Sequence, residues 1–315
     1  METPLRPKRG HLGELGDAVH DRSGEDRAGG VLDQEAIDVV TVIIAGADEL
    51  PLGAEAGDRG EGGLAVHDLA DHHRAGRILD QEIRSAIAQE IAGAIFVWFG
   101  DALHQDPAPF DPPIELVGED YSSFPCYADW NASWRYVYDN LMDPMHGTFL
   151  HANSHTMSQG DTQAVFVTRD TPHGFFFEKA GQRDVNFDWS EFVDNGALYV
   201  RLEIPYPASG GPGGNFGIVS AITPIDDTNS ACFFWRFRKV SGWQRNTWRF
   251  LYKTTLEPRH WQVLEQDREL MDGCGLGLEK HEMLYQHDAG LIRLRRYLAQ
   301  QARAQLTELR GAGKA

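Results

Sequence analysis

Aromatic residues divide the chain at about residue 92, and this division limits where a packed core can form. The 16 Phe, 8 Trp and 9 Tyr residues all lie from Phe96 onward. The preceding part is rich in Gly, Ala, Asp and Glu, a composition that buries too little apolar surface to offset the entropy of the chain. We therefore divide the 315 residues into an atypical acidic Gly/Ala-rich segment, 1–92, and a folded domain, 93–315.

The folded domain has the pattern of an α+β protein. Short β-branched and aromatic runs, bounded by Gly, Pro, Asp or Asn, predict five or more antiparallel strands. These runs are 164–168, 174–179, 197–204, 216–222 and 231–240, and a further apolar run at 95–99 predicts a buried strand. Apolar residues at helical spacing predict helical structure over 243–271 and a terminal helix over 290–309 that packs on the sheet.

Three side chains that can bind or serve a metal, Asp143, His146 and His151, lie in the spacing D-x2-H-x4-H. On an unbroken helix, two histidines five residues apart would point roughly 140° away from each other and could not share one ion. Pro144 and Gly147 disfavour an unbroken helix here. We therefore predict a kink that brings the two imidazoles together.

A helix is predicted to lead into this motif. Asn131 is placed to cap the start of the helix, and apolar residues then recur at helical spacing at Trp134, Val137, Tyr138, Leu141 and Met145. The pattern predicts a capped helix that runs into the motif.

Two imidazoles leave a divalent metal short of charge and of ligands, so a distant carboxylate is needed. Asp267 is the best candidate, because Leu264, Asp267 and Met271 fall on one face of a predicted helix. A carboxylate on an apolar stripe is costly to bury unless it is paired, and a metal would pair it. Two histidines and one aspartate with open positions are typical of non-haem Fe(II) oxygenases, while some zinc hydrolases use a similar set.

The motif N-x2-D-x2-H-x4-H that begins at Asn140, followed over a hundred residues later by Glu-Gln-Asp267, resembles the catalytic domain of Rieske-type aromatic ring-hydroxylating oxygenases, alpha subunit. The run that begins at Ile95 resembles the strand that joins the Rieske domain of that family to its catalytic domain. The resemblance covers the chain from about residue 93 onward. It implies the helix-grip fold, in which an antiparallel sheet grips long helices and a substrate cavity lies between them.

The resemblance also implies an activity and a set of roles. His146, His151 and Asp267 would hold mononuclear Fe(II), Asp143 would bridge towards a Rieske histidine of a neighbouring subunit, and Asn140 would lie next to the ligands. The family activates O2 with electrons from a Rieske cluster that a ferredoxin or reductase feeds, and it assembles as trimers. The expected reaction is the hydroxylation, dihydroxylation or O-demethylation of an aromatic substrate in aromatic compound catabolism, by a monooxygenase or a dioxygenase.

The chain departs from this family in residues 1–92. A two-iron two-sulfur Rieske cluster needs two cysteines and two histidines, whereas the first cysteine here is Cys126, followed by Cys232 and Cys274. We interpret the segment either as a poorly ordered extension or as an out-of-frame translation in place of a Rieske domain. Because this sequence offers no ligands for a Rieske cluster in residues 1–92, the chain would need electrons from another source.

Two other classes of function stay open. A zinc-dependent hydrolase would use the same two histidines and carboxylate, with Glu265 or Asp143 as the general base. A non-catalytic module would bind a hydrophobic ligand without metal. In either case His155 is predicted to line a pocket or the surface and not to act as a fourth ligand.

Charge and hydropathy exclude several partners. The net charge of −18 argues against binding to nucleic acid or to an anionic membrane. No stretch approaches the roughly 18 apolar residues of a membrane span, and the amino end lacks the apolar core of a signal peptide. The expected localisation is cytoplasmic.

Overall fold

The computed structural model describes residues 39–42, 87–98, 110–207 and 213–312. All of them belong to one compact unit, Asp38–Ala315. Most of the segment 1–92 therefore lies outside the described residues. The prediction that this segment is poorly ordered falls on those residues too. Among the described residues, no helix combines the length and the apolar character that a membrane span requires.

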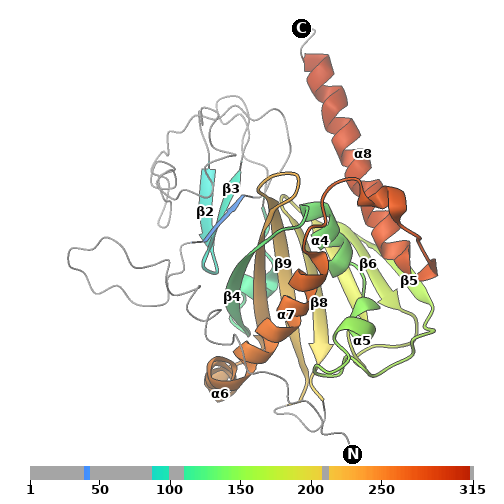
Figure 1. The fold of residues 1–315 in the computed structure, drawn as a ribbon. Helices are drawn as coiled ribbons and strands as arrows, with labels where there is room; N and C mark the ends of the chain where they lie inside the picture. The colour runs from blue at the N-terminus through green and yellow to red at the C-terminus, as the bar shows by residue number, and fades with distance from the viewer. Residues whose placement is uncertain (1–38, 43–86, 99–109, 208–212, 313–315) are drawn as a thin grey trace, which may run out of the picture. The chain divides into compact units, whose positions relative to one another are not determined.

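A seven-stranded antiparallel sheet forms the centre of the domain, in the order β4-β10-β9-β8-β7-β6-β5 (Figure 1). Its strands are β4 Tyr121–Trp130, β5 Phe166–Thr171, β6 Gly174–Lys179, β7 Trp189–Asp194, β8 Leu198–Pro205, β9 Asn215–Pro224 and β10 Ser230–Lys239. Five of these match the runs that the sequence predicted, and β4 and β7 were missed. The predicted α+β class with a large antiparallel sheet is confirmed.

Helices pack against the sheet. The α-helices are α3 Ile114–Val117, α4 Trp134–Leu141, α5 His146–Leu150, α6 Gly242–Leu251, α7 Glu257–Met271 and α8 Ala289–Ala312. Two short 3-10 helices, η3 Leu278–His281 and η4 Gln286–Asp288, lie between α7 and α8. Leu294 of α8 is fully buried in the core, which confirms the packed terminal helix.

The sheet buries a different hydrophobic cluster on each face, as strand β10 illustrates. Cys232 and Phe234 join the cluster under α4, α7 and α8, whereas Phe233, Trp235 and Phe237 join the cluster on the other face. This alternation is the two-residue period of a strand that is covered on both sides. Figure 1 shows α4, α5 and α7 against one face.

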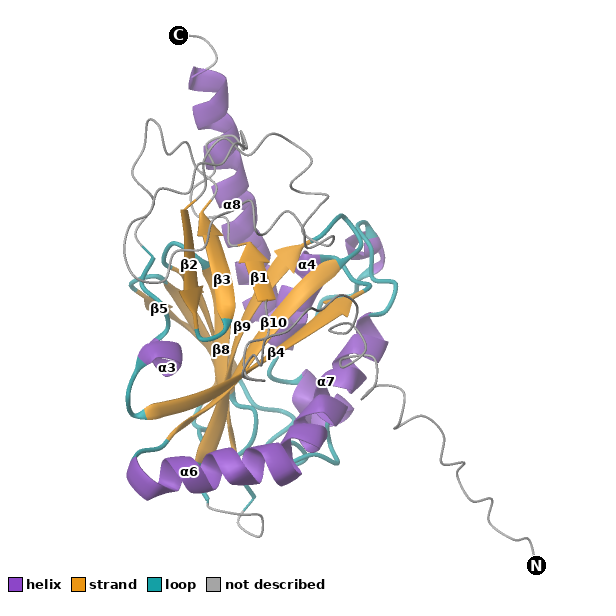
Figure 2. Ribbon diagram, turned by 90° about the vertical axis from the view of Figure 1, so that its left-hand side faces the viewer, coloured by secondary structure: helices purple, strands orange, loops and turns teal. Residues whose placement is uncertain are grey.

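A small second sheet supplies part of the other cluster. It has the order β1-β3-β2, with β1 Val39–Val42, β2 Ile87–Ile91 and β3 Ala94–Trp98, and the predicted strand at 95–99 corresponds to β3 (Figure 2). Phe96 stacks on Trp235, and the indole N–H of Trp235 donates to the carbonyl of Ala92 over 2.9 Å. The boundary placed between residues 92 and 93 falls in the turn of the β2–β3 hairpin.

The helical stretch before the site contains a widened turn. Residues Tyr252–Leu256 form a π-helical segment between α6 and α7, closed by a hydrogen bond from the N–H of Glu257 to the carbonyl of Tyr252. Pro258 follows directly in the first turn of α7. A proline ring clashes with the carbonyl four residues earlier, so the wider turn accommodates Pro258.

The capping role predicted for Asn131 is wrong. Helix α4 starts after Ser133, which occupies the capping position without a side-chain cap bond. The amide of Asn131 donates instead to Asp272 Oδ1 over 3.0 Å. This bond joins the start of α4 to the end of α7, so Asn131 links the two helices that lead to the site.

Candidate metal centre

The predicted break lies between α4 and α5. Helix α4 ends at Leu141, and α5 begins at His146. The rings of His146 and His151 then lie 5.1 Å apart between centroids. Gly147 has a different role from the one predicted, because it lies inside α5, where an added Cβ would come within 3.2 Å of the Phe187 ring.

Asp267 of α7 meets both histidines. Its Oδ1 atom lies 3.0 Å from His151 Nε2 and 3.5 Å from His146 Nε2. One ligand atom from each of the three residues lies within 4.8 Å of the others, and this is the group in the described part of the chain that could hold a metal ion. His146 lies in α5, His151 directly follows α5, and Asp267 lies in α7. Residues more than a hundred positions apart in the sequence therefore form one site.

The donor set fits a divalent transition metal. Two ligand atoms that each lie about 2.1 Å from an ion, at right angles to each other, are about 3.0 Å apart. The two distances to Asp267 are close to this value. His151 and Asp267 are 1% and 7% exposed, and a buried carboxylate needs a positive partner. Three protein ligands leave coordination positions for other molecules.

Gln266 and Asn140 orient the candidate ligands. Gln266 Oε1 lies 2.8 Å from His151 Nδ1. In the tautomer that donates Nδ1–H to Gln266, the lone pair of Nε2 points to the metal position. Asn140 Nδ2 donates to Asp267 Oδ1 over 3.3 Å, next to the ligands as the family resemblance implies. Sequence reasoning missed Gln266, although it immediately precedes Asp267.

The charge of Asp267 also acts on His151. Burial would lower the pKa of His151, but the hydrogen bond to Asp267, the charge of Asp267 and the bond to Gln266 together raise it above the ordinary 6.5. The carboxylate therefore favours a positive charge at His151 Nε2. A proton or a metal ion can supply that charge.

Asp143 lies outside this ligand group. It is half-buried, and its Oδ1 atom accepts the backbone N–H of Met145 over 2.8 Å. This bond closes the turn through Pro144, which is the alternative, structural role of an aspartate before a proline. Whether Asp143 also bridges to another subunit stays a prediction.

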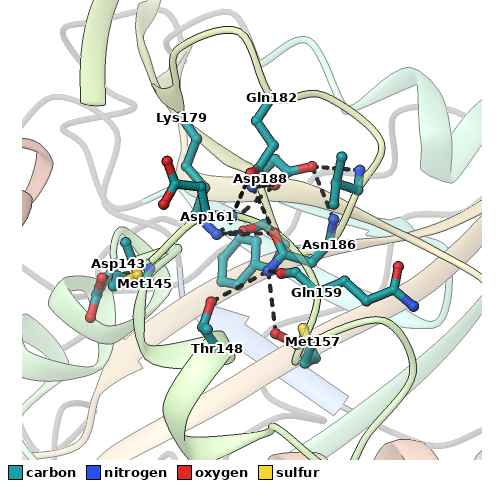
Figure 3. Close-up of polar contacts among 12 residues, drawn as sticks. Asp143, Met145, Thr148, Met157, Gln159, Asp161, Lys179, Gln182, Asn186 and Asp188 are labelled. Atoms are coloured by element: carbon teal, nitrogen blue, oxygen red, sulfur yellow. Dashed lines mark hydrogen bonds and ion pairs between the residues drawn. The ribbon is translucent and has the colours of Figure 1, made fainter. Parts of the chain in front are cut away.

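A buried polar network holds α5 and the loop that follows it. We name it the Asn186 network, and its members are Lys179, Gln182, Asn186 and Asp188. Lys179 Nζ donates to Asn186 Oδ1 over 3.0 Å and lies 3.9 Å from Asp188, and Gln182 Nε2 donates to Asp188 over 2.6 Å. Figure 3 shows the network, which lies between β6 and the loop that follows α5.

The amide of Asn186 makes the contacts to the site. Its Nδ2 atom donates to Thr148 Oγ1 over 3.3 Å, to the carbonyl of Met157 over 3.2 Å and to the carbonyl of Gln159. Thr148 lies between His146 and His151 in the chain. The network thus connects the β6–β7 region to the segment that positions both histidines (Figure 3).

The other side chains that could act as a general base or as a further metal ligand lie apart from the three candidate ligands. Glu265 is bound by Arg268, whose Nε donates to it over 2.8 Å. His155 is half-buried, and its ring lies 4.9 Å from that of Phe216. Burial raises the pKa of the Cys126 and Cys232 thiols, which disfavours the thiolate that metal binding needs.

Comparison with known proteins identifies similar sequences and folds. The model of the family "Vanillate O-demethylase oxygenase C-terminal domain" matches residues 130–304, more than half of the chain. No curated protein sequence matches the chain.

Two solved structures have a similar fold. Dicamba monooxygenase bound to dicamba is 15% identical with a TM-score of 0.53, over 73% of this chain and 72% of that chain. The oxygenase in the reduced oxygenase–ferredoxin complex of carbazole 1,9a-dioxygenase is 14% identical with a TM-score of 0.51, over 69% of this chain and 64% of that chain. At these identities, the likeness shows the fold.

Proposed function

Because the chain belongs to the vanillate O-demethylase oxygenase C-terminal domain family, and thus to the Rieske-type oxygenases, we propose that residues 93–315 form a mononuclear non-haem Fe(II) centre that oxygenates an aromatic substrate. The observation that carries the proposal is the convergence of His146, His151 and Asp267 within 4.8 Å. Two neutral imidazoles and one carboxylate suit Fe(II) and leave positions open on one side.

The residues of this chain would prepare the site for that chemistry. His146, His151 and Asp267 would hold Fe(II), which supplies the redox chemistry that O2 activation requires. Gln266 would fix the tautomer of His151, and Asn140 would fix the orientation of the Asp267 carboxylate. Hydroxylation or O-demethylation of the substrate is the reaction that we propose.

Electrons are proposed to come from outside this chain. The first cysteine of the sequence is Cys126, and burial disfavours the thiolates of Cys126 and Cys232, so a Rieske cluster on a different protein would deliver the electrons. The oxygenase–ferredoxin complex of carbazole 1,9a-dioxygenase supports a ferredoxin as the donor. A homotrimer, with Asp143 at the contact between subunits, is part of the same proposal.

The site gives less support to a zinc hydrolase. That reaction needs a carboxylate that is free to take a proton from bound water. Of the two candidates, Glu265 is bound by Arg268, and Asp143 accepts the N–H of Met145. The oxygenase is therefore the function that the geometry supports best.

Anaerobic titration with Fe(II), followed by nitric oxide, tests the proposal. We expect one Fe(II) per chain, and a nitric oxide complex detectable by electron paramagnetic resonance, because nitric oxide binds Fe(II) through an open position. The Asp267→Ala variant should lose both signals, and the Glu269→Ala variant, an exposed acidic residue on the same helix, should keep them. A metal-free chain, or one that prefers Zn(II) and binds no nitric oxide, would refute the oxygenase.

A further inference from the structure

Two carboxylates share one guanidinium where α8 meets α4. Arg295 of α8 donates through Nε and Nη2 to Asp139 Oδ2 of α4, over 2.9 and 2.6 Å. The same guanidinium donates through Nη1 and Nη2 to the two oxygens of Glu282, over 2.5 and 2.6 Å. Glu282 lies in the connection between η3 and η4. We call Asp139, Glu282 and Arg295 the α8 latch, and when all three are ionised it carries two negative charges and one positive charge.

Asp139 is the buried carboxylate of the latch. Its side chain is 7% exposed, whereas that of Glu282 is 25% exposed. The Oδ1 atom of Asp139 is buried and has no hydrogen-bond partner among the described residues. An ionised carboxylate accepts hydrogen bonds at both oxygens, so a buried oxygen without a donor disfavours the ionised form. The geometry therefore favours a neutral Asp139 whenever α8 is closed on α4.

The two carboxylates respond to their surroundings in opposite directions. The hydrogen bonds from Arg295 lower the pKa of Glu282, whereas burial raises the pKa of Asp139 to about 6 in spite of Arg295. The charge of Glu282 also raises the pKa of Asp139, and that of Arg135, exposed on α4, lowers it, each by less than burial does. As the pH falls, Asp139 is therefore the first of the two to take up a proton.

The other titratable groups on the elements around the latch have other partners or are exposed. On α8, Arg293 pairs with Asp170 of β5, and the Tyr297 hydroxyl donates to Asp194 of β7 over 2.6 Å. In η3, η4 and the rest of α8, the exposed or separately bonded groups are Glu279, Lys280, His281, His287, Asp288, Arg296 and Arg303. The balance of charge at Asp139 therefore depends on the latch and on Arg135.

Little apolar burial holds the segment that carries Glu282 and Arg295. Among residues 289–304 of α8, the buried ones are Gly290 and Leu294, and Figure 1 shows the helix extending beyond the sheet. In the connection next to Glu282, Met283 is 95% and Leu284 51% exposed. Segments with few buried apolar contacts open more readily than the core of a domain. The contacts of the latch therefore have a large share in keeping α8 closed.

We propose that the α8 latch is a pH-sensitive switch, which keeps α8 and the η3–η4 connection closed on α4 when Asp139 is protonated and lets them open more readily when it is ionised. Opening allows water to solvate the Asp139 carboxylate, which the closed state leaves with one unpaired oxygen. Glu282 and Arg295 both belong to the segment that moves, so their ion pair persists in the open state. The switch does not depend on the proposed function.

The direction of the effect follows from proton linkage. The pKa of Asp139 is about 6 in the closed state, and the ordinary value of 3.8 applies once water reaches the carboxylate. The closed state thus binds the proton more tightly, so the contribution of Asp139 to closure is complete below pH 3.8 and is lost as the pH rises through about 6. Between pH 4.5 and pH 7.5, the opening equilibrium should shift towards the open state by at least about tenfold.

Amide hydrogen exchange of the full chain, without added metal, tests the switch. The measured rate at each amide, divided by the intrinsic rate of the same amide at that pH, gives the opening constant and removes the direct effect of pH on exchange. We expect the opening constants of Leu294 and Leu298 in α8 to rise at least about tenfold from pH 4.5 to pH 7.5 relative to that of Val219 in β9. Constant values in α8 would overturn the inference.

Three variants assign the effect to Asp139. Asp139→Asn keeps the shape of the side chain and removes the charge, so the opening constants in α8 should no longer change with pH. Asp170→Asn removes the other carboxylate that pairs with an arginine of α8, on a side chain that is 85% exposed, and should keep the rise. His287→Phe removes the imidazole next to the start of α8 and should keep it too. A rise that persists in Asp139→Asn, or that disappears in either control, overturns the switch.

A titration of the unaltered chain decides the matter without any variant. The carbon-13 chemical shift of the Asp139 carboxyl group, followed by NMR, should change with a midpoint near pH 6. This readout holds even where Asp139→Asn does not fold. A midpoint below pH 4.5 would show that the closed state does not favour the protonated form, and it would overturn the inference.

Discussion

At the scale of single residues, the candidate metal centre depends on a chain of contacts in which each group orients the next. Gln266 holds the Nδ1 side of His151, Asp267 faces its Nε2 side, and Asn140 binds the Asp267 carboxylate. Each partner reduces the number of orientations that a ligand can adopt before metal binds. Groups that do not touch the metal should therefore change its affinity.

The Gln266→Leu variant tests this coupling. Loss of the Nδ1 partner frees the His151 ring to rotate and to change tautomer, so we expect Fe(II) affinity to fall by roughly 10–100-fold. Gln262→Leu is the matched control, because Gln262 is exposed one turn earlier on α7. Equal Fe(II) affinities of the two variants would show that Gln266 does not orient the ligand.

Fe(II) binding should also depend on pH through His151. Its pKa is above 6.5 because Asp267 and Gln266 outweigh burial, and Fe(II) must displace the proton that this pKa describes. Affinity should be highest above that pKa and should fall as the pH drops through it. Anaerobic titrations from pH 8.5 to pH 5.5 measure the effect, and an affinity that stays constant over this range would contradict it.

Sequence spacing predicted His146, His151 and Asp267 as ligands because helix breakers and one helical face restrict where they can point, and the structure brings the three together. It could not reveal Gln266 as a partner of His151, since that contact depends on how α7 is rotated against α5.

At the scale of elements, the Asn186 network decides how firmly the histidine segment is held. The side-chain amide of Asn186 bonds to α5 and to the loop after it. Lys179 donates to the Oδ1 atom of this amide, and Asp188 accepts the backbone N–H of Asn186. These groups are buried, so the removal of one leaves several others without partners. The network is the structural support of α5.

The Asn186→Ala variant should lower the free energy of unfolding by about 3 kcal/mol, because buried carbonyls and the Lys179 ammonium lose a partner. It should also weaken Fe(II) binding, since Thr148 lies between the two histidines. Urea denaturation and Fe(II) titration provide the measurements. Asn153→Ala, an exposed position in the same loop, is the control, and an unfolding midpoint equal to that of the control would refute the role of the network.

Two strands, β4 and β7, were not predicted from the sequence, and the structure shows why. Strand β4 contains Pro125, which argues against a strand inside a sheet, but β4 is an edge strand paired with β10 alone in the large sheet. Strand β7 contains Glu191, which is buried because Arg201 pairs with it. Edge position and ion pairing are properties of the assembled sheet, so a single strand sequence does not show them.

At the scale of the whole domain, α8 is joined to α4 and to the loop between η3 and η4 through one arginine. Arg295 donates to Asp139 of α4 over 2.6 Å and lies within ion-pair distance of Glu282. Burial raises the pKa of Asp139 to about 6 in spite of Arg295. The terminal helix is thus joined to the helix that leads into the metal centre.

Removal of this arginine should destabilise the domain. In Arg295→Met, the buried Asp139 loses its cation, and we expect the free energy of unfolding to fall by about 3 kcal/mol. Arg296→Met is the control at the exposed neighbouring position and should change it by less than about 0.5 kcal/mol. Chemical denaturation that gives the same stability for both variants would show that the ion pair does not fix α8.

We propose that one iron ion binds between α5 and α7, held by three residues of this chain. Diffraction from crystals grown anaerobically with Fe(II), recorded on both sides of the iron absorption edge, tests this binding. We expect one anomalous peak per chain, about 2.0–2.2 Å from His146 Nε2, His151 Nε2 and an Asp267 oxygen. Iron at other histidines, or a map with no peak between α5 and α7, would contradict it.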